Sequence, residues 1–172
     1  MTAPVTPARI TEASKTLANA EATAVACRKA SLPFYVACAL LEKESGGRNV
    51  YGGHDANGAL SGFPQLVNAG NFEVFRWLVL DKGQTSNGVG PCQITYKGYF
   101  TQMEAEGLKP WAVEDNRFFG FRILKANHDH IGQWMGAGAQ FNGSPRPNRA
   151  ALDYGRDFAA KVVKWQKRLG IS

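Results

Sequence analysis

The feature that most constrains the fold is an uninterrupted apolar run from Phe34 to Leu41, preceded by Pro33 and followed closely by a Gly-Gly pair. Its eight residues fall short of the about 18 that a membrane span requires, so we expect no membrane insertion. Apolar residues recur along it at helical spacing. The pattern predicts a buried helix over residues 34–44, with Ser31 as its cap and Pro33 in its first turn.

The rest of the chain is also dominated by helical periodicity, and alternation of period two is nowhere sustained. We therefore predict a mostly α protein, a helical bundle around the 34–44 helix with a loop-rich insert over residues 48–70 that has room for one small β-hairpin. Further helices are predicted over residues 10–27, 72–81 (capped by Asn71), 96–106, 115–130, 132–140 and 149–169. A length of 172 residues fits one domain, with residues 1–32 packed as a leader and helix on residues 33–172.

The charge balance favours a polyanionic partner. The chain has a net charge of +6, and five of these charges lie from Arg146 onward. Nucleic acid is one such partner, but the sequence has no helix-turn-helix, zinc or RNA-recognition signature. The first thirty residues do not resemble a secretory signal, so we expect synthesis in the cytoplasm. The three cysteines are expected to be free and buried.

Glu44 is the candidate for acid chemistry. It follows Leu40 by four residues and Leu41 by three, which places its side chain beside the apolar face at the C-terminal end of the helix. Partial desolvation and the negative end of the helix dipole both disfavour ionisation there. A carboxyl group that keeps its proton near neutral pH can protonate a glycosidic oxygen. The alternative is an ordinary solvated glutamate at a helix end.

Four motifs in order carry a resemblance. They are Glu44-Ser45, then Gly-Pro-Cys-Gln-Ile at 90–94, Ala-Gln-Phe-Asn-Gly at 139–143, and Tyr154 near the start of a terminal helix. Together they resemble the soluble lytic transglycosylases and goose-type lysozymes. The family usually has Leu-Met where this chain has Pro-Cys, and Tyr where it has Phe. An insertion over 59–86 is not explained by the resemblance, whereas the long Ala-rich front helix and the overall size resemble endolysin catalytic modules from phages of actinobacteria.

The resemblance implies a lysozyme-like α+β fold with a peptidoglycan groove and assigns roles to several residues. Glu44 would be the catalytic acid, and Tyr154 would face it from the later helix. The groove would be lined by Ser45, Gln93, Ile94, Phe141 and Asn142. Each of these residues has a structural alternative, which is stabilisation of the turn or helix that contains it.

Cleavage also requires a nucleophile, and the sequence leaves two routes open. In a hydrolase a second carboxylate activates water, and Asp55 in the glycine-rich insert is the candidate, although Asp-x-Asn-Gly is also common in surface turns. In a lytic transglycosylase the muramyl C6 hydroxyl attacks instead. Neither route needs a cofactor. A metal at His128-Asp129-His130 is not expected, because residues two apart on a helix point in different directions.

These observations predict an endolysin that cuts peptidoglycan between N-acetylmuramic acid and N-acetylglucosamine, with the hydrolase slightly favoured. We expect a monomer that binds glycan strands and not nucleic acid, is released to the wall with the help of a holin, and is drawn to the anionic wall surface. Lys161, Lys164 and Lys167 would form the attracting face. A non-catalytic wall-binding relative and a nucleic-acid-binding module are the alternatives.

Overall fold

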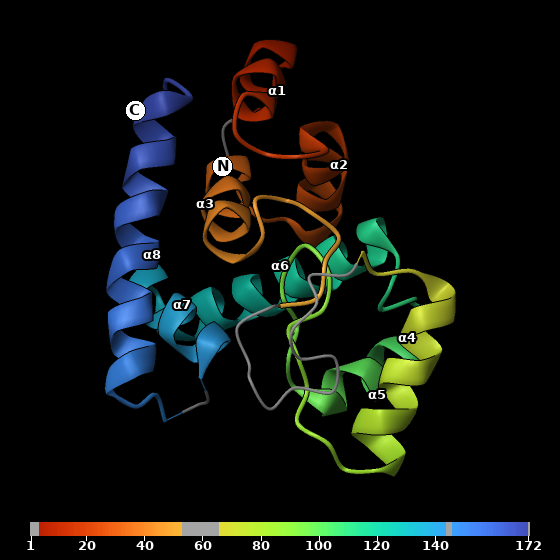
Figure 1. Ribbon diagram of the computed structural model, residues 1–172. Helices are drawn as coiled ribbons and strands as arrows, with labels where there is room; N and C mark the ends of the chain where they lie inside the picture. Colours follow the sequence, from red (N-terminus) through yellow and green to blue (C-terminus); the bar gives the residue numbers. More distant parts are fainter. Residues whose placement is uncertain (1–3, 53–65, 144–145, 172) are drawn as a thin grey trace.

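The computed structural model describes residues 4–52, 66–143 and 146–171, and this part of the chain is mostly helical, as predicted (Figure 1). The helices are α1 (Pro7–Ser14), α2 (Ala20–Ala30), α3 (Phe34–Glu44), α4 (Ala69–Arg76), a π-helical turn η1 (Trp77–Asp81), α5 (Lys97–Ala105), α6 (Val113–Ile131), α7 (Trp134–Asn142) and α8 (Arg149–Arg168). None of the helices in these ranges is long and apolar enough to cross a bilayer.

Helix α3 has the bounds predicted from the apolar run, and it lies between α2 and α8 (Figure 1). All residues from Phe34 to Leu41 except Tyr35 are buried. Gly46 and Gly47 follow with φ of 67° and 78°, a left-handed geometry that ends the helix and favours glycine. The predicted cap is wrong: Pro33 occupies the N-cap position, and Ser31 is the left-handed C-cap of α2.

The front of the chain forms two helices instead of the single long helix predicted. The chain leaves helical geometry after Ser14, and Asn19 adopts a left-handed conformation with φ of 54° before α2 begins. A tertiary contact explains the break, because the Ala18 N–H donates to the Gly46 carbonyl at 2.9 Å and so gives up the helical pattern. The apolar residues that suggested a single helix are nevertheless buried, and Ala13, Leu17 and Ala24 all lie in the core.

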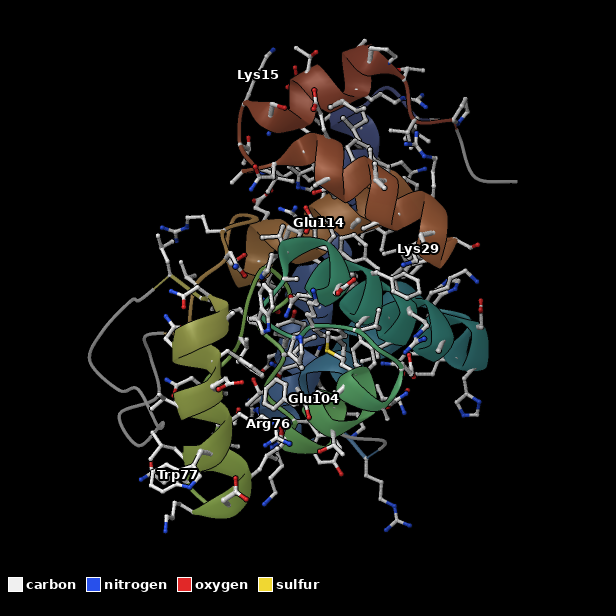
Figure 2. The ribbon with its side chains drawn as sticks, turned by 90° about the vertical axis from the view of Figure 1, so that its right-hand side faces the viewer. Lys15, Lys29, Arg76, Trp77, Glu104 and Glu114 are labelled. Atoms are coloured by element: carbon white, nitrogen blue, oxygen red, sulfur yellow. The ribbon has the colours of Figure 1, made fainter. Side chains whose placement is uncertain are left out.

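The described part of the insertion over residues 59–86 contains α4 and η1. The N-cap of α4 is Asn68 and not Asn71; Asn71 completes a capping box, because its Oδ1 accepts a hydrogen bond from the Asn68 backbone N–H. Arg76 at the end of α4 forms an ion pair with Glu104 of α5 at 2.8 Å, and the neighbouring Trp77 is exposed (Figure 2). The insertion therefore contains its own helix, and the ion pair between Arg76 and Glu104 connects this helix to α5.

The residues between α3 and α5 contain isolated antiparallel bridges in the described ranges. These pair Val50 with Leu66, Tyr51 with Val89, and Val89 with Ile94. The first bridge joins the two sides of the glycine-rich segment where a hairpin was expected. The segment itself, residues 53–65, lies outside the described part of the chain.

The C-terminal helices pack closely through small residues. A methyl group added at Gly138 of α7 would lie 2.4 Å from Phe158 of α8, and one added at Gly155 would lie 2.3 Å from the Met135 carbonyl oxygen. Residues 139–142, which belong to the third motif of the resemblance, form the last turns of α7, so this helix extends two residues beyond the predicted end at residue 140. Lys161 and Lys164 of α8 form ion pairs with Glu42 of α3 at 3.2 and 3.0 Å, so the expected lysine face is partly engaged within the fold.

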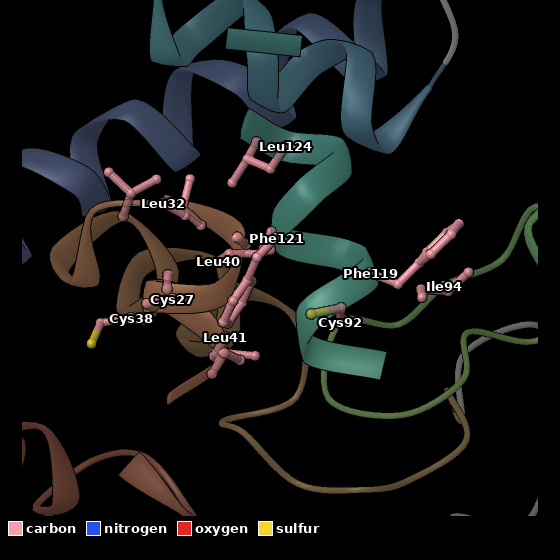
Figure 3. Close-up of a cluster of buried hydrophobic side chains, with 14 of the residues drawn as sticks. Cys27, Leu32, Cys38, Leu40, Leu41, Cys92, Ile94, Phe119, Phe121 and Leu124 are labelled. Carbon is pink, nitrogen blue, oxygen red and sulfur yellow. The ribbon is translucent and has the colours of Figure 1, made fainter. Parts of the chain in front are cut away.

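One hydrophobic cluster connects α1, α2, α3, the insert and α5 to α8. Figure 3 shows its centre, where Leu40 and Leu41 of α3 lie beside Phe121 of α6, and Ile94 lies near Phe119. Cys27, Cys38 and Cys92 are buried and free, as expected from the sequence. Burial of this extent holds α3 in a fixed position and therefore fixes the direction of its C-terminal end.

Candidate active site

Glu44 is the last residue of α3 and is partly buried. Burial raises the pKa of its carboxyl group from about 4.5 to about 7, even though a hydrogen bond from Tyr154 and the positive charge of Lys43 both act to lower it. Near neutral pH this group is present in both protonation states. It can therefore give up a proton and take one back, as a general acid and base must.

Tyr154, on the first turns of α8, donates its hydroxyl hydrogen bond to Oε1 of Glu44. Burial and the adjacent carboxylate hold the pKa of Tyr154 well above its ordinary value, so the phenol keeps its proton and remains a donor. The two residues are 110 positions apart in the sequence, and the packing of α3 against α8 brings them together. This is the contact that the resemblance implied.

Two charged residues support Tyr154, and sequence reasoning did not identify them. The Lys43 ammonium lies 4.2 Å from the centre of the Tyr154 ring and forms an ion pair with Asp157, one turn further along α8. The spacing of Tyr154 and Asp157 by three residues was visible in the sequence. What was not visible is that Lys43, next to Glu44, lies opposite that face of α8.

Ser45 connects the acid to the 90–94 segment. Its hydroxyl donates to the Pro91 carbonyl at 2.8 Å, and its own carbonyl accepts from Nε of Arg48 at 2.9 Å. The charge of Glu44 also raises the pKa of the neighbouring Cys92 thiol, although burial is the larger cause. The Glu44-Ser45 and Gly-Pro-Cys-Gln-Ile motifs, which are far apart in the sequence, are thus adjacent in space.

Gln93 and Ile94 lie in the same segment, residues 90–94, and their hydrogen bonds to nearby backbone groups hold this segment in place. Gln93 has a φ of 48°, and its Nε2 donates to the carbonyls of Val50 and Gly90 at 2.9 and 2.8 Å. Its side chain occupies the space that a Cβ at Gly88 would need. Ile94 is buried and pairs with Val89 through backbone hydrogen bonds. In this state both residues serve the turn.

The remaining candidates are more scattered. Phe141 is partly buried and packs against the core, whereas Asn142 is exposed at the end of α7. Asp55 lies outside the described residues, so its proposed role stays a prediction. Of the candidates in the described ranges, the structure joins Glu44, Ser45 and Tyr154 directly.

A cavity of about 500 Å³ lies beside Glu44, between the end of α3 and the connection from α1 to α2. Its lining residues are Thr16, Ala18, Glu42, Glu44, Ser45, Gly46 and Arg48. The base of this region is held by Arg117 of α6, a buried residue whose Nη2 donates to the carbonyls of Ala18 and Gly47 at 3.0 and 2.8 Å. The proton donor therefore lies on the wall of an accessible space.

Other motifs in the sequence do not add to this site. No group of three or more His, Cys, Asp or Glu side chains in the described ranges is arranged to hold a metal ion, and His128 instead stacks on Trp134 with ring centres 3.7 Å apart. Comparisons with protein-family models, with curated proteins and with solved structures gave no match. Any functional assignment therefore has to be argued from the chemistry of Glu44 and its neighbours.

Proposed function

We propose that this protein cleaves the β-1,4 bond between N-acetylmuramic acid and N-acetylglucosamine in peptidoglycan, with Glu44 as the general acid. The observation that carries the proposal is a carboxyl group with a pKa of about 7, hydrogen-bonded by Tyr154 and open to a cavity. The ordered motifs that resemble lytic transglycosylases and goose-type lysozymes supply the substrate class. We extend the proposal to a lysozyme-like arrangement with a saccharide groove at Glu44.

The first step is a proton transfer from Glu44 to the glycosidic oxygen as the bond from that oxygen to C1 breaks. The departing sugar leaves as an alcohol, positive charge develops at C1, and Glu44 becomes a carboxylate. The Tyr154 hydroxyl stabilises this carboxylate, because it donates to Oε1. A pKa of about 7 keeps both directions of proton transfer accessible near neutral pH.

Two routes complete the reaction. In hydrolysis, Asp55 takes a proton from water, the water oxygen attacks C1, and a reducing end forms. In transglycosylation, the muramyl C6 hydroxyl attacks C1 and gives its proton to the Glu44 carboxylate, which leaves a 1,6-anhydro end. We favour hydrolysis because of the endolysin resemblance and the presence of Asp55 in the insert. The biological role that follows is that of a phage endolysin reaching the wall after holin-dependent release.

The test combines wall clearing with mass spectrometry of the released fragments. We expect the wild type to clear a peptidoglycan suspension and Glu44→Gln to lose activity by about 10²- to 10⁴-fold, the usual contribution of general acid catalysis. Glu21→Gln, an exposed glutamate of α2, is the matched control and should keep full activity. Clearing retained by Glu44→Gln would contradict the proposal. Reducing ends in the fragments identify hydrolysis, and ends lighter by one water identify transglycosylation.

A further inference from the structure

The cavity beside Glu44 has an unusual charge pattern. Arg48 is exposed on its wall, and the bond from Nε to the Ser45 carbonyl holds the side chain at the end of α3. The terminal nitrogens of Arg48 contact no carboxylate among the residues that the structure describes. Within the described ranges, the guanidinium group therefore presents its two-pronged donor edge without a carboxylate counter-ion.

Glu42 is the other ionised residue on the cavity wall, and its negative charge is already compensated by neighbouring donors. It accepts hydrogen bonds from Lys161, Lys164 and Nε1 of Trp165 at 3.2, 3.0 and 2.6 Å. Burial alone would raise the pKa of Glu42, but these donors outweigh it and lower the pKa, so the carboxylate is ionised and fully engaged. Two ammonium groups bound to one carboxylate leave Glu42 with no uncompensated negative charge to present to the cavity.

Glu44 is neutral when it is ready to donate its proton, so Arg48 is then the charged lining residue whose charge no described carboxylate compensates. A substrate whose glycosidic oxygen lies at Glu44 must place other ring substituents along the same wall. An anionic substituent would meet Arg48 there, and planar carboxylates match the guanidinium fork.

Resting on the peptidoglycan-cleaving function above, we propose that this cavity binds a carboxylate of the substrate close to the scissile bond, with Arg48 as the specificity-determining residue. Peptidoglycan offers this group in its stem peptides and, once these are removed, in the lactyl group of muramic acid. The enzyme would accordingly prefer strands with free carboxylates over otherwise identical strands in which they are blocked.

The test uses short soluble strands in two forms, one with free carboxylates and one converted to neutral amides by carbodiimide coupling to ammonia. We expect kcat/KM of the wild type to be about tenfold higher on the free form, within the range of one charge-assisted interaction. Arg48→Gln should reduce this ratio to about one, chiefly through KM on the free form, while Arg48→Lys keeps part of it because the charge remains. Arg28→Gln, an exposed charge on α2, should keep the wild-type ratio.

Strands without stem peptides, again free or amidated, identify the source of the carboxylate. A preference that persists on them assigns the lactyl group, and one that disappears assigns the stem peptide. An unchanged ratio in Arg48→Gln overturns the inference, as does an equal fall of kcat on both forms, which would mean that Arg48 only supports Ser45. A wild type that cleaves neither form contradicts the proposed function itself, and the inference fails with it.

Discussion

At the scale of a single residue, Glu44 combines influences that oppose one another. Burial favours its neutral form, whereas Tyr154 and Lys43 favour the carboxylate, and the balance leaves the pKa at about 7. Full burial without these partners would leave an acid unable to release its proton, and full exposure would leave a carboxylate without a proton to give. The position at the end of α3 provides the intermediate environment.

This balance has a consequence for stability. The folded protein binds a proton at Glu44 more tightly than the unfolded chain does, so stability falls as the pH rises from about 4.5 to about 7. Glu44→Gln removes this loss, and we expect it to raise the free energy of unfolding at pH 8 by roughly 1–3 kcal/mol. At pH 4, where the wild-type carboxyl is neutral, the two proteins should be nearly equal. Urea unfolding at both pH values measures this, and an equal difference at each pH would contradict it.

At the scale of the element, the contact between α7 and α8 helps to hold the helix that carries Tyr154. Gly155, the next residue along α8, faces Met135 and Ala139 of α7 so closely that a side chain has no room. Glycine normally weakens a helix interior. Here it permits the close approach of α7 and α8, while the packing of α8 against α3 brings the Tyr154 hydroxyl to Glu44.

We therefore expect Gly155→Ala to destabilise the protein by about 1–3 kcal/mol, as overpacking does, instead of stabilising α8. Gly70→Ala in α4 is the matched control, because the nearest atom to its added methyl group would be 3.6 Å away. That variant should gain roughly 0.5–1 kcal/mol from higher helix propensity. Denaturant unfolding of both variants checks the prediction, and a stability gain in Gly155→Ala would show that the helices can separate without cost.

The elements also show how far the sequence could be interpreted. Helices α3 and α8 were predicted within one residue, because their apolar spacing is regular and a glycine pair marks the end of α3. The break after Ser14 was missed because it depends on a hydrogen bond from Ala18 to Gly46, which no local pattern records. Asn68 was missed because Asn71 is an equally plausible cap by residue type.

For the candidate site too, some residues could be predicted from the sequence and others could not. Glu44, Ser45 and Tyr154 were found from short motifs, and the structure brings them together. Lys43 and Asp157 were not found, because their ion pair joins α3 to α8 and depends on how the two helices face each other. A local sequence pattern predicts a helix and its boundaries. The residues that surround Glu44 are determined instead by the packing of helices that are far apart in the sequence.

At the scale of the whole molecule, the positive charge is not uniformly available. Lys161 and Lys164 are engaged with Glu42, and Arg168 forms an ion pair with Glu12 of α1 at 2.8 Å. Arg149 and Lys167 are exposed on α8 and have no ion-pair partner among the described residues. Long-range attraction to an anionic wall would therefore depend more on Arg149 and Lys167 than on Lys161 and Lys164.

We expect the double variant Arg149→Gln and Lys167→Gln to clear walls about two- to fivefold more slowly at low ionic strength, where fields extend about 30 Å at 0.01 M salt. The difference should vanish at 1 M salt, where the screening length is about 3 Å. Cleavage of short uncharged glycans serves as the control and should not change. A loss that persists at high salt would assign these residues to folding or to a direct contact.

The hydrogen bond from Ser45 to Pro91 fixes the position of Glu44 relative to residue 91, whatever the length of the chain that connects the two. The end of α3 is fastened directly to the far side of the insert, and the Gly52 N–H donates to the Gly88 carbonyl at 2.8 Å. Ser45 and Pro91 are 46 positions apart in the sequence, so this contact fixes the end of α3 independently of the path that the chain takes between them. Substitutions at exposed positions of α4 and η1, such as Val74 and Trp77, should therefore leave the proton donor in place.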